Sequence, residues 1–484
     1  MILTGSSSTS APQFHVLNEM QCKKLYEGTL VCLQRVGVQM HNAQARALLA
    51  ASGANVDGQI VHIPARLVEQ AIKNAPSAFS VWGRDGKHEM RVAIDRVHFG
   101  PGPTCTYFID PSTGERRPAR RGDAELVAKV CDALHNIDYI MGLSLSSDVI
   151  PSLASVYEFA EEMANTTKPI VIWANSNSAL QDIHEIATVV AGGEESLRTK
   201  PNYAYFTTYE SPLKLADAPL ANLMWTAERG IPSICLGGPT VGLESPFTGA
   251  SALVLFLSSV IAALTVVQLT RPGAAMVVGG LPSMMDMRTG RPAYGSPEAS
   301  LHSAACADLA RYLHLPFMGT AGASESKTID AQAGVEAAFE VVLATLSGAS
   351  LVHDVGFLDC ADIGSLDYLV LSDEIISMAA RIMRGVTVNE DTIMMDLIEK
   401  VGPGGTFMNQ AKSASLCRSE AWVPTVLDRS PFAAWEKNGR LGTSDAIRKK
   451  LLKILNTHQP TPLQPDVVDK IRKILDRAEE RERK

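Results

Sequence analysis

The chain is poor in the short motifs by which many enzymes and binding proteins are identified. Its 484 residues hold only eight cysteines, and no two of them form a CxxC pair, which argues against a structural zinc ribbon and against a secreted disulfide framework. HExxH, GxxxxGK[ST] and the dinucleotide-binding GxGxxG are also absent. Metal, mononucleotide and dinucleotide binding therefore lack their usual sequence signals, and we expect no metal site and no tightly bound cofactor.

An excess of positive charge is missing too. The 44 Lys and Arg residues are outnumbered by 52 Asp and Glu residues, and the net charge of −8 is spread along the chain without a basic patch. Because phosphate backbones are bound by such patches, we expect no nucleic-acid partner. The first fourteen residues lack the basic start and apolar core of a signal peptide, so we expect a cytoplasmic protein.

One uncharged stretch, residues 245–270, is long enough to cross a bilayer. Ser, Thr and Gln recur through it, and no cluster of Lys or Arg flanks it. We therefore expect a buried helix of a soluble protein and no contact with a membrane.

Short β-rich runs alternate with longer helical patterns through the middle of the chain, as in successive β-α units. Eight such units close a (β/α)8 TIM barrel, an α/β fold. The expected strands are residues 104–109, 139–144, 170–174, 203–207, 233–236, 274–278, 317–319 and 350–355. We expect a helical N-terminal cap over residues 1–95, the barrel over 96–375, and a helical C-terminal extension packed on the barrel over 376–484.

Helix starts in this region are marked by capping residues. Asp123, Ser152, Ser296 and Asp330 each precede a helical pattern, and Pro297 follows Ser296 at a first turn. These signals support the β-α rhythm that the barrel requires.

The active site of a TIM barrel lies where the carboxyl ends of its strands meet. Aromatic faces at this rim attract a quaternary ammonium cation, and a carboxylate supplies the opposite charge. His353 is the best polar candidate, because a histidine at the rim can donate a hydrogen bond to a substrate carboxylate. Ordinary packing of the aromatic residues and a purely structural histidine are the alternatives. The candidates are Tyr107, Tyr209, Glu210, His353 and Phe357, with Trp173 and Phe206 as further aromatic residues.

Longer patterns, distributed over nearly the whole chain, resemble the trimethylamine methyltransferase (MttB-like) family. They are LYEGTLVCLQRVGVQMHN at residues 25–42, SGANVDGQIVHIPARLVEQAIKNAP at 52–76, VWGRDG at 81–86, YFIDPSTGERRPARRGD at 107–123, SPL at 211–213, DAQAGVE at 330–336 and the closing WEKNG and LLKILNTHQPTPLQPDVVDKIRKIL segments.

The resemblance implies a TIM barrel that moves a methyl group from an amine to Co(I) of a separate corrinoid-binding protein, for methanogenesis-type transfer to a later carrier. The founding members contain pyrrolysine, whereas this chain shows only the twenty ordinary amino acids. It therefore resembles the non-pyrrolysine branch, whose known type acts on glycine betaine. In that case Tyr107, Tyr209 and Phe357 are expected to surround the trimethylammonium group, and His353 to bind the carboxylate.

Other functions remain open at this point. Trimethylamine, carnitine, proline betaine or choline are alternative methyl donors, and a methoxy compound or methyltetrahydrofolate belongs to a further class. A non-catalytic barrel that binds quaternary amines without turnover is the alternative from outside enzymology. We also expect a homo-oligomer.

Overall fold

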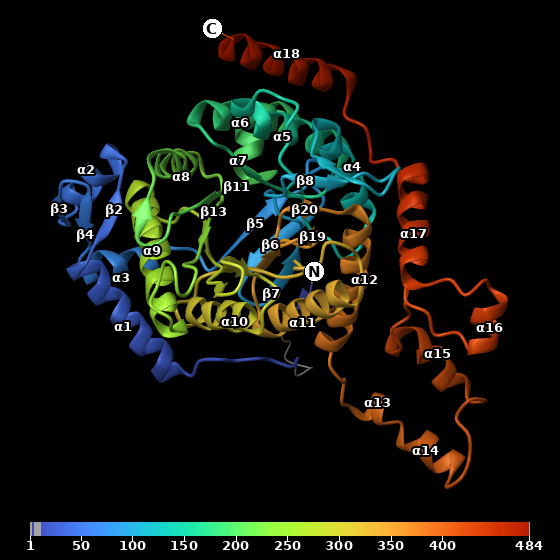
Figure 1. The fold of residues 1–484 in the computed structure, drawn as a ribbon. Coiled ribbons are helices and arrows are strands. Elements are labelled where there is room, and N and C mark those ends of the chain that lie inside the picture. Colours follow the sequence, from blue (N-terminus) through green and yellow to red (C-terminus); the bar gives the residue numbers. More distant parts are fainter. Residues whose placement is uncertain (1, 4–10, 484) are drawn as a thin grey trace.

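Seven parallel strands form the centre of the fold. The computed structural model describes residues 2–3 and 11–483, and Figure 1 shows helices arranged around a curled sheet. The order across the sheet is β7 (Arg96–Phe99), β18 (Leu351–His353), β17 (Phe317–Thr320), β14 (Met276–Gly280), β13 (Ser233–Gly237), β11 (Tyr203–Thr208) and β10 (Ile170–Trp173), with the short β1 (Ile2–Leu3) antiparallel beside β7.

The two edges of this half-barrel are linked by one segment, residues 138–141. The Asp138 amide donates to the Phe99 carbonyl of β7 at 2.7 Å, and the Val171 amide of β10 donates to the Ile140 carbonyl at 2.8 Å. Ile140 also forms an isolated parallel bridge with Ile170. The expected strand at 139–144 therefore closes the gap between β7 and β10 through single backbone hydrogen bonds and an isolated β-bridge, and it does not form a regular strand.

The expected first strand was wrong. Residues 104–109 contribute β8 (Tyr107–Ile109) to a separate four-stranded sheet with β9 (Arg116–Pro118), β19 (Phe357–Leu358) and β20 (Ile363–Gly364). The position beside β18 is held by β7 instead. Both segments are short and β-rich, and only their different pairing partners separate them. The other six expected strands lie within two or three residues of observed ones.

A compact cluster of side chains fills the interior of the curled sheet. The hairpin of β5 (Ala78–Trp82) and β6 (Glu89–Ala93) contributes to it and precedes β7 directly. His98 Nε2 of β7 lies 2.9 Å from the Arg91 carbonyl of this hairpin. The cluster comprises Val81, Met90, Val92, Tyr139, Met141, Val171, Ala204, Phe206, Ile234, Leu236, Val277, Met318 and Leu351, with Phe79, Trp173 and Leu281 packed against it.

Helices cover the outside of the sheet. They are α4 (Arg121–Ala133), α5 (Ala154–Asn165), α6 (Asn177–Ala191), α8 (Asp217–Arg229), α9 (Gly249–Thr270), α10 (Pro297–Tyr312), α11 (Ala331–Ser347) and α12 (Leu366–Met383), with the short η1 (Pro151–Leu153) and α7 (Glu194–Thr199). Ser296 and Asp330 cap α10 and α11 as expected, because each side chain accepts the N3 backbone amide. Asp123 lies inside α4 and Ser152 lies in η1, so these two expected starts were slightly misplaced.

The uncharged stretch forms α9. It is the one helix among the described residues that is long and apolar enough to cross a membrane, and 78% of its most apolar 18-residue stretch is buried inside the protein. It packs against α1 (Glu19–Arg35), α3 (Ala65–Asn74) and α8. This burial supports the prediction of a core helix.

The N-terminal region is not wholly helical. Besides α1, α2 (Ala43–Ala51) and α3, it contains β2 (Val38–Met40), β3 (Asn55–Asp57) and β4 (Ile60–His62), which form a four-stranded sheet with β12 (Lys214–Leu215). These strands have three residues each, too few to show an alternating pattern between the strong helical patterns on either side.

The C-terminal region has two parts. α17 (Thr443–Thr457) packs on α12 and α4, and α18 (Pro465–Glu482) packs on α6 and α5. Between α12 and α17, a segment containing α13 (Glu390–Ile393), α14 (Met395–Val401), α15 (Ala411–Glu420) and α16 (Phe432–Lys437) projects away from the body (Figure 1). We call residues 386–442 the projecting segment; past its middle it returns to the body, where Glu374 of α12 accepts the Thr425 and Val426 amides and Val426 is buried.

Candidate functional site at the carboxyl ends of the strands

Three of the predicted residues face the interior of the sheet at its carboxyl end. Trp173 ends β10, Phe206 lies on β11 and His353 ends β18. Phe206 belongs to the interior cluster, and Trp173 packs against it. The ring centroids of Phe206 and His353 are 6.1 Å apart. Two aromatic faces and one imidazole therefore meet where the strands end.

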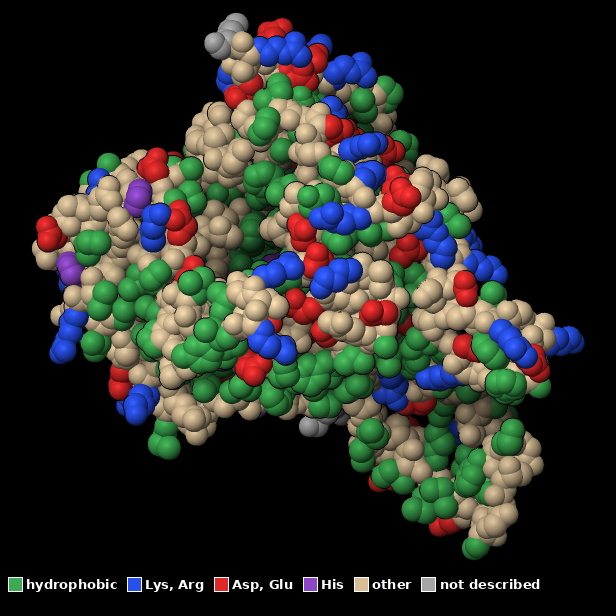
Figure 2. Space-filling view, viewed as in Figure 1, with side chains coloured by type: hydrophobic (Ala, Val, Ile, Leu, Met, Phe, Trp, Pro, Cys, Tyr) green, Lys and Arg blue, Asp and Glu red, His purple; other side chains and the backbone are tan. Residues whose placement is uncertain are grey.

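The mouth of the curled sheet is open on one side. Figure 2 shows a hollow near the centre of the molecule with mostly hydrophobic walls, at the place where β11 and β13 are labelled in the same view of Figure 1. The buried cluster that fills the interior of the sheet supplies apolar side chains to this region.

His353 is held by a short chain of polar side chains. Its Nδ1 contacts Asp354 Oδ1, and the Thr320 hydroxyl donates to Asp354 Oδ2. His353 and Asp354 are both buried, and His353 Nε2 has no hydrogen-bond partner among the described residues. With the Nδ1 proton directed at the carboxylate, Nε2 is an acceptor in the neutral ring and a donor in the doubly protonated ring.

The backbone around Asp354 is tightly constrained. Asp354 has a φ of 79°, in the left-handed region that a non-glycine residue rarely adopts. Gly102 leaves the room that its side chain needs, because a Cβ at Gly102 would lie 2.2 Å from Asp354 Oδ1 and 3.0 Å from Phe357 Cζ. Such strain is retained where the surrounding structure enforces it, often at functional sites.

Two buried carboxyl groups lie behind Trp173. Its indole Nε1 donates to Glu158 Oε2 at 3.3 Å, and the Gly142 amide donates to Glu162 Oε1 at 2.6 Å. The other oxygen of each carboxyl group has no partner among the described residues. Burial raises the pKa of Glu158 to about 8, and burial together with the Glu158 charge raises the pKa of Glu162 well above its usual value. Both groups are therefore largely protonated at neutral pH.

Sequence reasoning missed these two glutamates. They lie four residues apart on α5 and hence on one face of the helix. The sequence signal that could have indicated them is the spacing of two glutamates by four residues on the otherwise apolar face of the ASVYEFAEEMAN helix. A third buried carboxyl group, Glu340 of α11, accepts the Gly322 amide at 2.7 Å, and burial raises its pKa.

Tyr107 and Tyr209 do not join the three interior residues. The guanidinium carbon of Arg116 lies 3.2 Å from the centroid of the Tyr107 ring, so a cation from the chain itself already covers that face. Tyr209 belongs to the other core cluster, and its ring lies 2.8 Å from where a Gly237 Cβ would stand. Its buried hydroxyl has no partner among the described residues, and burial raises its pKa.

Glu210 and Phe357 also lie apart from the aromatic pair. Glu210 is exposed and forms an ion pair with Lys214. Phe357 is fully buried beside Gly102, and its amide donates to the Asp354 carbonyl at 3.3 Å. Of the seven predicted residues, the structure gathers Trp173, Phe206 and His353, with Phe357 behind them.

Metal ligands do not cluster in the described part of the chain. No group of three or more His, Cys, Asp or Glu side chains there could hold a metal ion. The eight cysteines are free, and five of them are buried.

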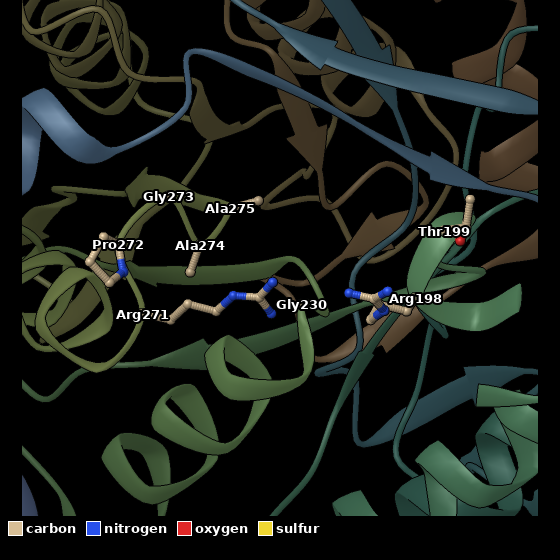
Figure 3. Close-up of a pocket in the computed structure, with 8 residues that line it drawn as sticks. All are labelled: Arg198, Thr199, Gly230, Arg271, Pro272, Gly273, Ala274 and Ala275. Atoms are coloured by element: carbon tan, nitrogen blue, oxygen red, sulfur yellow. The ribbon is translucent and has the colours of Figure 1, made fainter. Parts of the chain in front are cut away.

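A pocket at the opposite end of the strands is a poor alternative site. It has a volume of about 420 Å³ and is lined by Arg198, Gly230 and residues 271–275 (Figure 3). Its two arginines already have partners within the protein. Arg198 pairs with Glu195 at 2.8 Å, and Arg271 donates to the Glu228 carbonyl at 3.1 Å. A ligand would have to compete with both.

Comparison with known proteins places the chain in context. A family model described as trimethylamine methyltransferase (MTTB) matches residues 5–482. The chain is 30% identical over 466 residues to a glycine betaine methyltransferase of Desulfitobacterium hafniense (strain Y51), covering 96% of this chain and 97% of that protein. It is also 30% identical over 485 residues to the trimethylamine methyltransferase MttB of Methanosarcina barkeri (strain Fusaro / DSM 804), covering 99% and 98%.

Solved structures of a related fold exist. The monomethylamine methyltransferase MtmB of Methanosarcina barkeri has a TM-score of 0.53 at 12% identity, covering 91% of this chain and 89% of that chain. A hydroxylamine complex of MtmB has a TM-score of 0.54 at 11% identity, covering 97% and 88%. At such identities the likeness concerns the fold alone.

Proposed function

Because the chain belongs to the trimethylamine methyltransferase (MTTB) family, we propose that it moves a methyl group from a quaternary amine, with glycine betaine favoured, to Co(I) of a partner corrinoid protein. The protein is a methyltransferase, and its relatives are corrinoid-dependent. The observation that carries the choice of a quaternary amine is the mouth itself. Trp173 and Phe206 are paired on neighbouring strands, and Phe206 lies beside His353, whose Nε2 has no hydrogen-bond partner among the described residues.

Trp173 and Phe206 replace the tyrosines as the proposed walls for the trimethylammonium group. Each aromatic face contributes about 0.5–2 kcal/mol to cation binding once water is excluded. The hydrogen bond from Trp173 to Glu158 fixes the ring plane from behind. The rings therefore give affinity for any compact N-methyl cation.

His353 is proposed to bind the carboxylate of glycine betaine. In its doubly protonated form, the ring lies between Asp354 on the Nδ1 side and the substrate carboxylate on the Nε2 side. The buried Asp354 charge offsets the imidazolium charge, and each ring nitrogen donates to an oxygen. A substrate without a carboxylate would leave the Nε2 hydrogen bond unmade.

The reaction requires little acid–base catalysis from this chain. A quaternary ammonium already has a neutral tertiary amine as its leaving group, so the C–N bond pair returns to nitrogen without protonation. The partner's corrinoid supplies the Co(I) nucleophile, and this chain positions one methyl group toward the open mouth and excludes water. Protonated Glu158 and Glu162 fit this role, because they add no charge beside the cation.

Several finer expectations remain proposals. We infer a closed eight-stranded barrel in which residues 138–141 stand for the eighth strand, supported by their hydrogen bonds to both β7 and β10. The division at residues 95 and 375 and a cytoplasmic location remain predictions. Burial of α9 supports a protein without a membrane span.

We also propose a homo-oligomer, supported by the projecting segment. No residue of α13, α14, α15 or α16 is buried, and helices this short are unstable without tertiary contacts. A second copy would cover their apolar side chains. The exposed apolar residues are Val386, Val388, Ile393, Met395, Ile398, Phe407, Met408, Val423, Phe432 and Leu441.

The direct test mixes the purified protein with a Co(I) corrinoid protein and a panel of amines. Glycine betaine should change the corrinoid absorbance by methylation, and trimethylamine, carnitine, proline betaine and choline should react more slowly. Affinity for amines without any turnover would indicate the non-catalytic binding barrel instead. Turnover of a methoxy compound or methyltetrahydrofolate, with none for any amine, would refute the proposal.

A further inference from the structure

Three exposed apolar side chains lie on neighbouring loops beside the mouth. Leu243 and Phe247 belong to the loop after β13 and are 69% and 57% exposed. Met287 is 73% exposed in the turn between β15 (Met284–Asp286) and β16 (Arg291–Ala293), the hairpin that follows β14. Both loops leave the carboxyl ends of their strands, on the side where Trp173, Phe206 and His353 meet. We call these three residues, with the cations described below, the rim patch.

The backbone beneath the rim patch is firmly held. The Val241 amide donates to the Ser283 carbonyl at 2.9 Å, and the Met285 amide donates to the Val241 carbonyl at 3.2 Å, so the two loops form one unit. Gly242 has a φ of 93°, and the Phe247 ring lies 2.5 Å from where its Cβ would stand. The apolar side chains are therefore displayed on a folded surface and do not belong to a loose loop.

Charged side chains of both signs border the apolar residues. Arg288 is 92% exposed beside Asp286, and Arg291 and Lys327 share Asp359 at 3.2 and 3.5 Å. Two further carboxylates lie close by, because Glu244 follows Leu243 in its loop and Glu325 acts on Arg291. Figure 2 shows Lys and Arg side chains together with Asp and Glu side chains along the edge of the central hollow.

We propose that the rim patch is the docking surface for the partner corrinoid protein, which would present an apolar area with charged side chains of both signs at its border. This inference rests on the proposed function, since the methyl acceptor must reach the mouth from outside. An apolar centre with a charged border is the usual anatomy of a transient interface. A permanent second copy is a poor occupant, because it would cover the mouth at every turnover.

The proposal predicts a separation between partner binding and amine binding. Leu243→Asp and Arg288→Glu each change a solvent-exposed side chain, and each should weaken binding of a purified family corrinoid protein at least about 10-fold by titration calorimetry. The amine affinity should stay within about 2-fold of wild type. Met20→Asp is the matched control, because Met20 is 79% exposed on α1, away from the strand ends, and partner binding should be unchanged.

The two proposals can fail separately. If wild type binds the corrinoid protein and both rim variants bind it equally well, the docking surface is refuted, whatever the turnover. The same holds if wild type does not bind it at all. If the rim variants lose partner binding while no amine is turned over by wild type, the docking surface is supported and the proposed function fails.

Discussion

Replacement of His353 by Ala gives the most decisive test of the substrate. His353 is 4% exposed, its ring lies beside Phe206, and its Nε2 has no hydrogen-bond partner among the described residues. Losing a buried, charge-assisted hydrogen bond costs about 1–3 kcal/mol, which corresponds to a Kd raised about 5-fold to 150-fold. The lower end applies if water replaces the imidazole, and the upper end applies if the substrate carboxylate stays unpaired.

The assay compares two ligands that differ only at the polar end. Glycine betaine and choline both carry a trimethylammonium group, and only betaine has a carboxylate. Titration calorimetry of His353→Ala should show the full loss for glycine betaine and little change for choline. His353→Gln keeps a side-chain donor and should recover part of the betaine affinity. Equal losses for both ligands would refute the assigned role and point to a structural histidine next to Asp354.

Four further predictions follow from named contacts. Trp173→Leu should weaken every quaternary amine, choline included, by about 0.5–2 kcal/mol in the same titration, and Trp173→Phe by less; an effect confined to betaine would contradict the cation-binding role. Gly102→Ala should cost about 1–3 kcal/mol of stability in chemical denaturation, because its Cβ would clash with Asp354 Oδ1, whereas Gly122→Ala, with nothing within 4 Å, should be neutral or slightly stabilising. Glu158 keeps its proton in the folded state up to about pH 8 but loses it at about pH 4.3 when unfolded. It therefore lowers wild-type stability progressively as pH rises between these values, by at most about 1.4 kcal/mol per pH unit. The Tm advantage of Glu158→Gln should therefore grow from pH 5 to pH 8, with partly exposed Glu161→Gln as the flat control. Val388→Asp combined with Met408→Asp should reduce the oligomer to monomers in light scattering, while Met20→Asp leaves its mass unchanged; an unchanged mass in the double variant would show that the projecting segment is not the interface.

The alternation of side chains along β11 explains why only one of Phe206 and Tyr209 faces the interior. Side chains alternate between the two faces of a strand, so Phe206 and Tyr209, three residues apart, cannot both face the interior while the strand continues. The structure places Phe206 inside and Tyr209 in the outer core. This alternation predicts from the sequence that the two residues face opposite sides of the sheet. Which side becomes the interior depends on the direction in which the sheet curls.

The sequence by itself determined the family, the β-α rhythm, six of the strands and the residue types at their ends, because these follow from patterns within a few residues or from motifs spread along the chain. Only the tertiary structure decided that β7 takes the place expected for residues 104–109, and that Arg116 covers Tyr107. It also decided that Glu158 and Glu162 are buried behind Trp173. These outcomes depend on pairings between distant segments and on the water that they exclude, which local patterns do not specify.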